Sequence, residues 1–203
     1  MISDKPAWLR PHGEPWKPGT ERVAFESGWI RVTDQTAIAP TGRPAPYGLV
    51  RFKNLAVAVL PIHEDGTVTL VGQHRFPLSD YSWELPEGGS PLDEDPLDGA
   101  KRELAEEVGL QAADWRQILV MELSNSITDE FCHGFLAMDL TPTATAPDET
   151  EDLAIARVPF GQALDAAVSG QMPDSLTVAL LLRVHHMAVK GELPADLARL
   201  VLG

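Results

Sequence analysis

The pattern of hydrophobic and polar positions divides the chain into two regions of different texture. Residues 21–39 alternate between apolar and polar side chains around a turn signal at Ser27-Gly28, which predicts a β-hairpin. Residues 47–52 predict a third strand. Because three short strands bury too little apolar surface to be stable alone, we expect residues 1–52, an N-terminal arm with accessory strands, to pack on the next domain or on a second subunit.

From residue 53 to residue 203 the pattern predicts one larger domain. Residues 55–62 are continuously apolar, as in a strand that is buried on both faces. The other expected strands are residues 67–76, 81–86, 117–123 and 130–140, and the expected helices are residues 95–108, 160–169, 174–190 and 194–202. Strands followed by helices that cover the sheet indicate an α/β fold, arranged as an α/β/α sandwich.

The helix predicted at residues 95–108 has a clear beginning, end and buried face. Asp95 can cap its N-terminus, Pro96 suits its first position, and Gly109 can end it. At about 100° per residue, one stripe of this helix is apolar and can pack on the sheet. That stripe consists of Leu97, Ala100, Leu104 and Val108.

Three glutamates, Glu103, Glu106 and Glu107, occupy the stripe beside the apolar one. Their spacing brings like charges together, which destabilises a helix by roughly a few tenths of a kcal/mol per pair. A solvated helix face is the ordinary interpretation of such a pattern. The alternative is a bound divalent cation, because Mg²⁺ and Mn²⁺ prefer oxygen ligands and would remove the repulsion. Arg102 can reach Glu106, and Glu94, just before the helix, can fold back towards the same group.

The charge of the chain restricts its partners. The formal net charge is −14 over 203 residues, and an acidic surface repels nucleic acid and anionic lipid headgroups. We therefore expect neither nucleic acid nor membrane as a partner, and a phosphate-bearing substrate would need bound cations.

The single cysteine, Cys132, excludes an internal disulfide and fits a reducing compartment. Without a signal peptide or a membrane-length apolar run, the sequence predicts a cytoplasmic protein.

The residues around the predicted helix resemble a known motif. They match every fixed position of a Nudix box, G-x5-E-x7-R-E-U-x-E-E-x-G-U, where U is a bulky aliphatic residue. The matching positions are Gly88, then Glu94 after five residues, then the run RELAEEVGL (residues 102–110) after seven more. The resemblance implies the Nudix fold, an α/β/α sandwich with a mixed sheet. It also implies hydrolysis of a nucleoside diphosphate linked to another group, with Mg²⁺ or Mn²⁺ as cofactor.

The resemblance also implies roles for residues of the box. Glu103 and Glu107 correspond to metal ligands, and Glu106 to a ligand or a residue that holds metal-bound water. Arg102 and Glu94 correspond to residues that orient the carboxylates, and the backbone carbonyl of Glu87 completes the metal shell. Metal ions would neutralise the pyrophosphate, lower the pKa of a water molecule and align both for in-line attack at phosphorus.

The flanks of the motif are similar to the ADP-ribose pyrophosphatase-like branch. The resemblance rests on LVGQHRFPLSDYSWELPEGG (residues 70–89) and SNSITDE (residues 124–130), and it implies nucleoside diphosphate sugars such as ADP-ribose, ADP-glucose or GDP-mannose as substrates. ADP-ribose-selective relatives often carry Pro-Gly where this chain has Asn125-Ser126, so the sugar nucleotide stays open. Members of the branch are usually homodimers whose N-terminal region helps to build the neighbouring site, and a homodimer is therefore expected.

Four residues are candidates for binding the substrate beside the metal. Arg75 resembles a phosphate-contacting arginine and could hold the pyrophosphate through two hydrogen bonds, although a surface salt bridge is the alternative. Glu84 is expected to face the ligand, and Gly88 lets the backbone approach it closely. Glu130 is a candidate for binding the terminal sugar or a metal-bound water; a plain surface glutamate is the alternative.

The remaining predictions concern the base and the general base. Trp29 could stack on a nucleobase, or it could pack in a core or a dimer interface. The acidic run at residues 148–152 suits a general base, for which Glu151 is favoured over Glu149. Two other functions stay open: a Nudix domain that binds nucleotide sugars without turning them over, and a Nudix hydrolase of another nucleoside diphosphate derivative.

Overall fold

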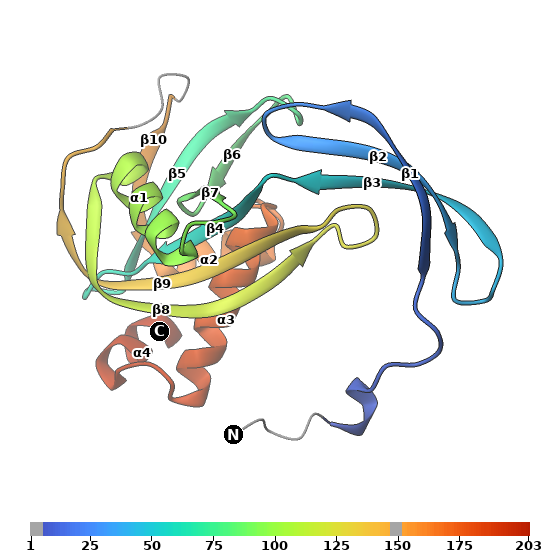
Figure 1. The fold of residues 1–203 in the computed structure, drawn as a ribbon. Helices are drawn as coiled ribbons and strands as arrows, with labels where there is room; N and C mark the ends of the chain where they lie inside the picture. The colour runs from blue at the N-terminus through green and yellow to red at the C-terminus, as the bar shows by residue number, and fades with distance from the viewer. Residues whose placement is uncertain (1–5, 147–151) are drawn as a thin grey trace. The chain divides into compact units, whose positions relative to one another are not determined.

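The computed structural model describes residues 6–146 and 152–203, which form two compact units (Figure 1). Unit 1 consists of Met1–Lys53 together with Ser124–Asp129, and unit 2 consists of Asn54–Leu123 and Glu130–Gly203. The segment Ser124–Asp129 therefore belongs with the N-terminal strands, whereas the sequence pattern placed it in the second region. Nothing in its local sequence signals this pairing, which depends on hydrogen bonds to a distant strand.

Unit 1 is built on a three-stranded antiparallel sheet in the order β1-β2-β3. Its strands are β1 (Lys17–Glu26), β2 (Ile30–Ile38) and β3 (Pro44–Phe52), and a short 3-10 helix η1 (Ala7–Leu9) precedes them. The strand β1 begins at Lys17, before the hairpin that the sequence pattern predicts at residues 21–39. The 124–129 loop is joined to β3, because the Val50 amide donates to the Ile127 carbonyl at 2.8 Å.

The central sheet of unit 2 is mixed, with strands in the order β7-β4-β9-β8. The strands are β4 (Asn54–Pro61), β7 (Glu87–Pro91), β8 (Leu110–Leu123) and β9 (Glu130–Pro142). β4 and β9 run parallel, and the other two pairs are antiparallel. This confirms the expected mixed sheet.

A second sheet of unit 2, in the order β10-β5-β6, is antiparallel. It contains β5 (Thr67–Arg75), β6 (Asp80–Glu84) and β10 (Ala154–Pro159). The strands β7 and β10 and the first half of β8 were not predicted. The sequence of β7, EGGSP, has poor β propensity, and its pairing with β4 decides its structure.

Helix α1 (Pro96–Val108) begins and ends as its sequence predicts. The Asp95 side chain accepts a hydrogen bond from the Leu97 amide at 3.0 Å, and Gly109 ends the helix at a φ of 63°. The predicted stripe faces the sheet: Ala100, Leu104 and Val108 share a buried cluster with residues of β4, β5 and β9, and Leu97 packs at its edge.

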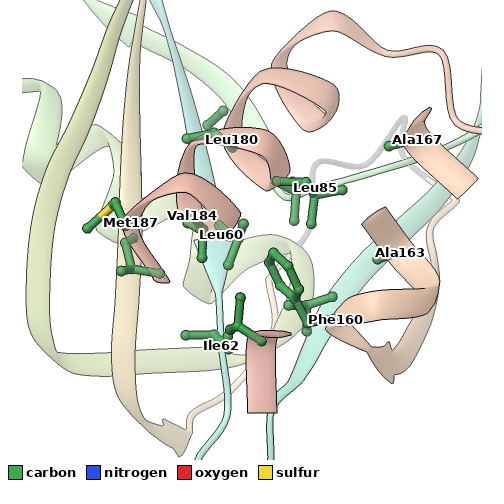
Figure 2. Packing of buried hydrophobic residues seen from close by; sticks show 14 of the residues in the cluster. Leu60, Ile62, Leu85, Phe160, Ala163, Ala167, Leu180, Val184 and Met187 are labelled. Carbon is green, nitrogen blue, oxygen red and sulfur yellow. The ribbon is translucent and has the colours of Figure 1, made fainter. Parts of the chain in front are cut away.

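Helices α2 (Phe160–Val168), α3 (Ser175–Lys190) and α4 (Ala195–Leu202) cover the opposite face of the sheet. Alternate residues of β4 point to opposite sides: Val57 and Val59 face α1, whereas Leu60 packs with Phe160 and Leu180 (Figure 2). Unit 2 is therefore the predicted α/β/α sandwich. Among the helices of the described residues, none has the length and apolar character needed to cross a bilayer.

Candidate active site

The three glutamates of the motif lie together on α1, and we call Glu103, Glu106 and Glu107 the α1 carboxylates. Arg102 is placed among them: its Nη1 donates to Glu103 Oε1 at 2.8 Å and to Glu106 Oε2 at 3.0 Å. Its Nη2 donates to the Gly89 carbonyl at 2.7 Å, which fixes the guanidinium against β7. Glu103 and Glu107 are buried and Glu106 is half-exposed, so the group is a partly covered site rather than a solvated helix face.

The backbone of β7 lies directly against the α1 carboxylates. A Cβ atom added to Gly88 would come within 2.2–2.4 Å of the carboxylate atoms of Glu103. One residue earlier, the Glu87 amide donates to Glu107 Oε2 at 3.1 Å. Glycine is therefore required at position 88 for a close approach between strand and carboxylate, which is the physical reason for the first glycine of the motif.

Glu94 lies just before α1, where it accepts a hydrogen bond from Ser90 Oγ at 2.9 Å. Gly99 makes room for this contact, because a Cβ there would lie 2.6 Å from Ser90 Oγ and 3.4 Å from Glu94 Oε2. The structure thus places Glu94 between the end of β7 and the first turn of α1. There it can hold β7 and α1 together, and its role in orienting the α1 carboxylates stays a prediction.

The α1 carboxylates fit a hard divalent cation. They supply oxygen ligands from one helix, an arginine already positions two of them, and the Gly88 backbone leaves space beside Glu103 that a side chain would fill. The residues that would hold the ion are Glu103, Glu106 and Glu107.

A second group of carboxyl groups was only partly anticipated. Glu84 at the end of β6, Glu87 at the start of β7 and Asp174 just before α3 each place a carboxylate oxygen within 4.8 Å of the others. We call these residues the α3 cluster. Asp174 was missed, because its sequence context signals only the start of a helix; its side chain indeed accepts from the Thr177 amide at 2.7 Å.

Arg75 is paired with two members of the α3 cluster. Its Nε donates to both carboxylate oxygens of Glu84 at 3.1 Å, and its Nη2 donates to Glu87 Oε1 at 2.7 Å. The guanidinium remains about one-third exposed, whereas Glu84 is 2% exposed. The salt-bridge alternative therefore describes Arg75 in this structure, and a contact with pyrophosphate stays a prediction.

Glu87 carries the unusual electrostatics of the site. Burial raises the pKa of its carboxyl group well above the ordinary value, and the charges of Asp174 and Glu84 raise it further, against the opposing effect of Arg75. Its Oε2 is buried and has no hydrogen-bond partner among the described residues. Only the backbone carbonyl of Glu87 was expected to contribute to the site, and the buried side chain is the unexpected feature.

Glu130, Trp29 and the acidic run fall in three different places. Glu130 begins β9 and is half-buried. Burial, together with the charges of Glu87, Asp174 and Glu130, raises the pKa of the Cys132 thiol to about 12. Trp29 belongs to unit 1, between β1 and β2, and is 71% exposed, so it is not a core residue. The general-base candidates Glu149 and Glu151 lie outside the described residues.

Comparisons with known proteins identify the family of the chain. Residues 52–176 match the family described as the NUDIX domain. The chain is 32% identical over 145 residues to an ADP-ribose pyrophosphatase of Mycobacterium tuberculosis, covering 70% of each chain. It is 32% identical over 159 residues to an ADP-ribose pyrophosphatase of Bacillus subtilis, covering 77% of this chain and 84% of the relative.

A solved structure described as an ADP compounds hydrolase has the same fold, with a TM-score of 0.80 and 22% sequence identity over 90% of this chain and 98% of that one. The family match covers α1, the strand β7 beside it and the start of α3. From the motif, the fold and these relatives together, the chain belongs to the Nudix family and is a pyrophosphohydrolase.

Proposed function

We propose that this protein hydrolyses the pyrophosphate bond of a nucleoside diphosphate sugar to a nucleoside monophosphate and a sugar phosphate, with Mg²⁺ or Mn²⁺ as cofactor. The observation that carries the proposal is the α1 carboxylate group, with Arg102 inside it and the Gly88 backbone against it. The similarity to two ADP-ribose pyrophosphatases supports a sugar nucleotide as substrate.

In this proposal the α1 carboxylates bind the cofactor and the chain around them keeps them in place. Arg102 holds Glu103 and Glu106, the Glu87 amide holds Glu107, and Glu94 joins the end of β7 to the start of α1. A bound divalent cation would offset the negative charge of the pyrophosphate and make a water molecule more acidic. The carbonyl of Glu87 is a further candidate ligand.

The proposal also assigns roles in substrate binding and proton transfer to residues outside the α1 carboxylates. Arg75 would donate hydrogen bonds to the pyrophosphate from the exposed part of its guanidinium, while Glu84 keeps the arginine in place. Glu130 is proposed to contact the terminal sugar, and Trp29 to stack on the base. Glu151 is the proposed general base.

We also propose that the protein acts as a homodimer in which unit 1 contributes to dimerisation and substrate binding. The support is the exposure of its apolar side chains: Val23, Phe25 and Trp29 are 49%, 56% and 71% exposed. Light scattering after size-exclusion chromatography measures the mass directly, and a mass of one chain at micromolar concentration would contradict the dimer.

A substrate panel tests the function. The purified protein is incubated with ADP-ribose, ADP-glucose, GDP-mannose and NADH in the presence of Mg²⁺, and the products are identified by mass spectrometry. We expect a nucleoside monophosphate and a sugar phosphate from at least one sugar nucleotide. Binding of these nucleotides without cleavage of any would instead indicate a catalytically silent binding domain.

A further inference from the structure

The α3 cluster offers a second place for a metal ion, apart from the α1 carboxylates. We propose that Glu84, Glu87 and Asp174 bind a divalent cation with a preference for hard oxygen ligands, such as Mg²⁺ or Mn²⁺. This inference does not depend on which substrate is hydrolysed, since it concerns ion binding in the free protein. Three independent features of the described residues support it.

The first feature is the spacing of the oxygen atoms. One carboxylate oxygen from each of the three residues lies within 4.8 Å of the others. Oxygen ligands bind Mg²⁺ at about 2.0–2.1 Å, so two ligands of one Mg²⁺ ion lie at most ~4.2 Å apart, and the oxygen atoms must move slightly towards one another. The three carboxylates can therefore reach a common ion through small side-chain movements.

The second feature is the unpaired oxygen of Glu87. Oε1 accepts a hydrogen bond from Arg75, whereas Oε2 is buried without a hydrogen-bond partner, alone among the side-chain atoms of residues 6–146 and 152–203. Buried polar atoms in folded proteins are almost always satisfied, and an exception is explained by strain, by a catalytic role, or by an ion or water that completes it. A cation in the α3 cluster would bind Oε2 while Oε1 stays with Arg75.

The third feature is the balance of charge. Three carboxyl groups meet one guanidinium, so an ionised cluster has two negative charges in excess. Like charges this close and this buried repel strongly, because little water reaches them. One divalent cation would balance the cluster; protons taken up by the carboxyl groups are the competing solution.

The ligands are also held in position by their surroundings. Asp174 is fixed by its hydrogen bond from the Thr177 amide, and Thr177 Oγ1 accepts from the Leu85 amide at 2.9 Å. Thr177 is fully buried, so α3 and the segment between β6 and β7 are joined at this point. Such supporting contacts are what keep carboxylates in a geometry that a metal ion can use.

The test measures Mn²⁺ binding by isothermal titration calorimetry to the full chain without nucleotide. The double variant Glu103→Gln/Glu107→Gln removes two α1 ligands, and we expect it to retain one equivalent of Mn²⁺. Adding Asp174→Asn should weaken that remaining binding at least about 10-fold, while asparagine still caps α3. The matched control Asp196→Asn, at the exposed start of α4, should leave it unchanged.

Two outcomes would overturn the proposal. One is that the double variant binds no Mn²⁺, as expected if protons neutralise the cluster; the other is the same affinity after Asp174→Asn, as expected if the ion binds elsewhere. If the Asp174 variant does not fold, as judged by circular dichroism, Glu87→Gln in the same background replaces it and is judged by the same criterion. Failure of hydrolysis in the substrate panel would contradict the proposed function and leave this binding result unaffected.

Discussion

The two acidic groups of unit 2 contain the same parts and differ in how the chain assembles them. Each has three carboxyl groups with one arginine beside them: Arg102 for the α1 carboxylates and Arg75 for the α3 cluster. The first group comes from five consecutive positions of one helix. The second comes from β6, β7 and the residue before α3, and it is joined only when the sheet and α3 pack together.

The difference explains why one group is visible in the sequence and the other is not. Helical spacing puts Glu103, Glu106 and Glu107 on one face whatever the rest of the chain does. The meeting of Asp174 with Glu87 depends on the docking of α3 through Thr177 and Leu85. A site made within one element can be recognised from spacing, whereas a site made between elements requires the fold.

Neutralising a single α1 carboxylate is expected to have the largest effect. Glu107→Gln removes a ligand charge, and metal assistance is worth several kcal/mol, so kcat should fall roughly 100- to 1,000-fold. The change is measured by steady-state kinetics at saturating Mg²⁺. The exposed Asp98→Asn on the same helix is the control and should retain full activity. Full activity of Glu107→Gln would contradict the role of the α1 carboxylates in catalysis, and it would leave no functional difference between them and the α3 cluster.

Filling the space at Gly88 should have the next largest effect. In Gly88→Ala the new Cβ would meet the Glu103 carboxylate, which must move away, so metal affinity should fall by about 100-fold. The flexible side chain can yield, so the melting temperature should change little. Gly161→Ala, where a Cβ meets nothing within 4 Å, is the matched control. A Gly88→Ala protein with normal Mn²⁺ affinity would contradict the close approach of β7 to Glu103.

Replacing the arginine of the α1 group tests its positioning role. Arg102→Lys keeps the charge, but a single ammonium group cannot hold Glu103, Glu106 and the Gly89 carbonyl as the planar guanidinium does. We expect metal affinity to fall about 10-fold. The neighbouring Lys101→Arg, which reverses the exchange at an exposed position, should have no effect. Equal behaviour of the two variants would show that Arg102 supplies charge alone.

The smallest effect is expected at Glu26, where two cationic side chains, Arg31 and Lys53, pair with one carboxylate. Hydrogen bonds from Arg31 and Lys53 lower the pKa of this exposed carboxyl group to about 2. Its contribution to stability is therefore present above the ordinary value of 4.5 and is lost as the pH falls towards 2. Lys53→Met should raise the pKa measured by carbon NMR titration, whereas Lys190→Met should not. An unshifted pKa in the first variant would show that Arg31 acts alone.

The extent of sequence-based prediction follows the same division between local and tertiary signals. The ends of α1 could be predicted because Asp95 and Gly109 act on the residues next to them. The strand β7 could not, because Gly88 and Gly89 are poor strand formers and only pairing with β4 makes them extended. The side-chain role of Glu87 was missed for a related reason: its burial is produced by distant residues.

Because its single cysteine is unreactive, this protein is a convenient background for labelling at cysteines introduced on its surface. Cys132 is fully buried, and burial raises the pKa of its thiol to about 12, so almost none of the reactive thiolate exists under ordinary conditions. Maleimide reagents should leave the native chain unmodified. A cysteine introduced on the surface of either unit would carry a fluorophore or spin label alone, and the wild-type sequence serves as the labelling background without prior removal of its own thiol.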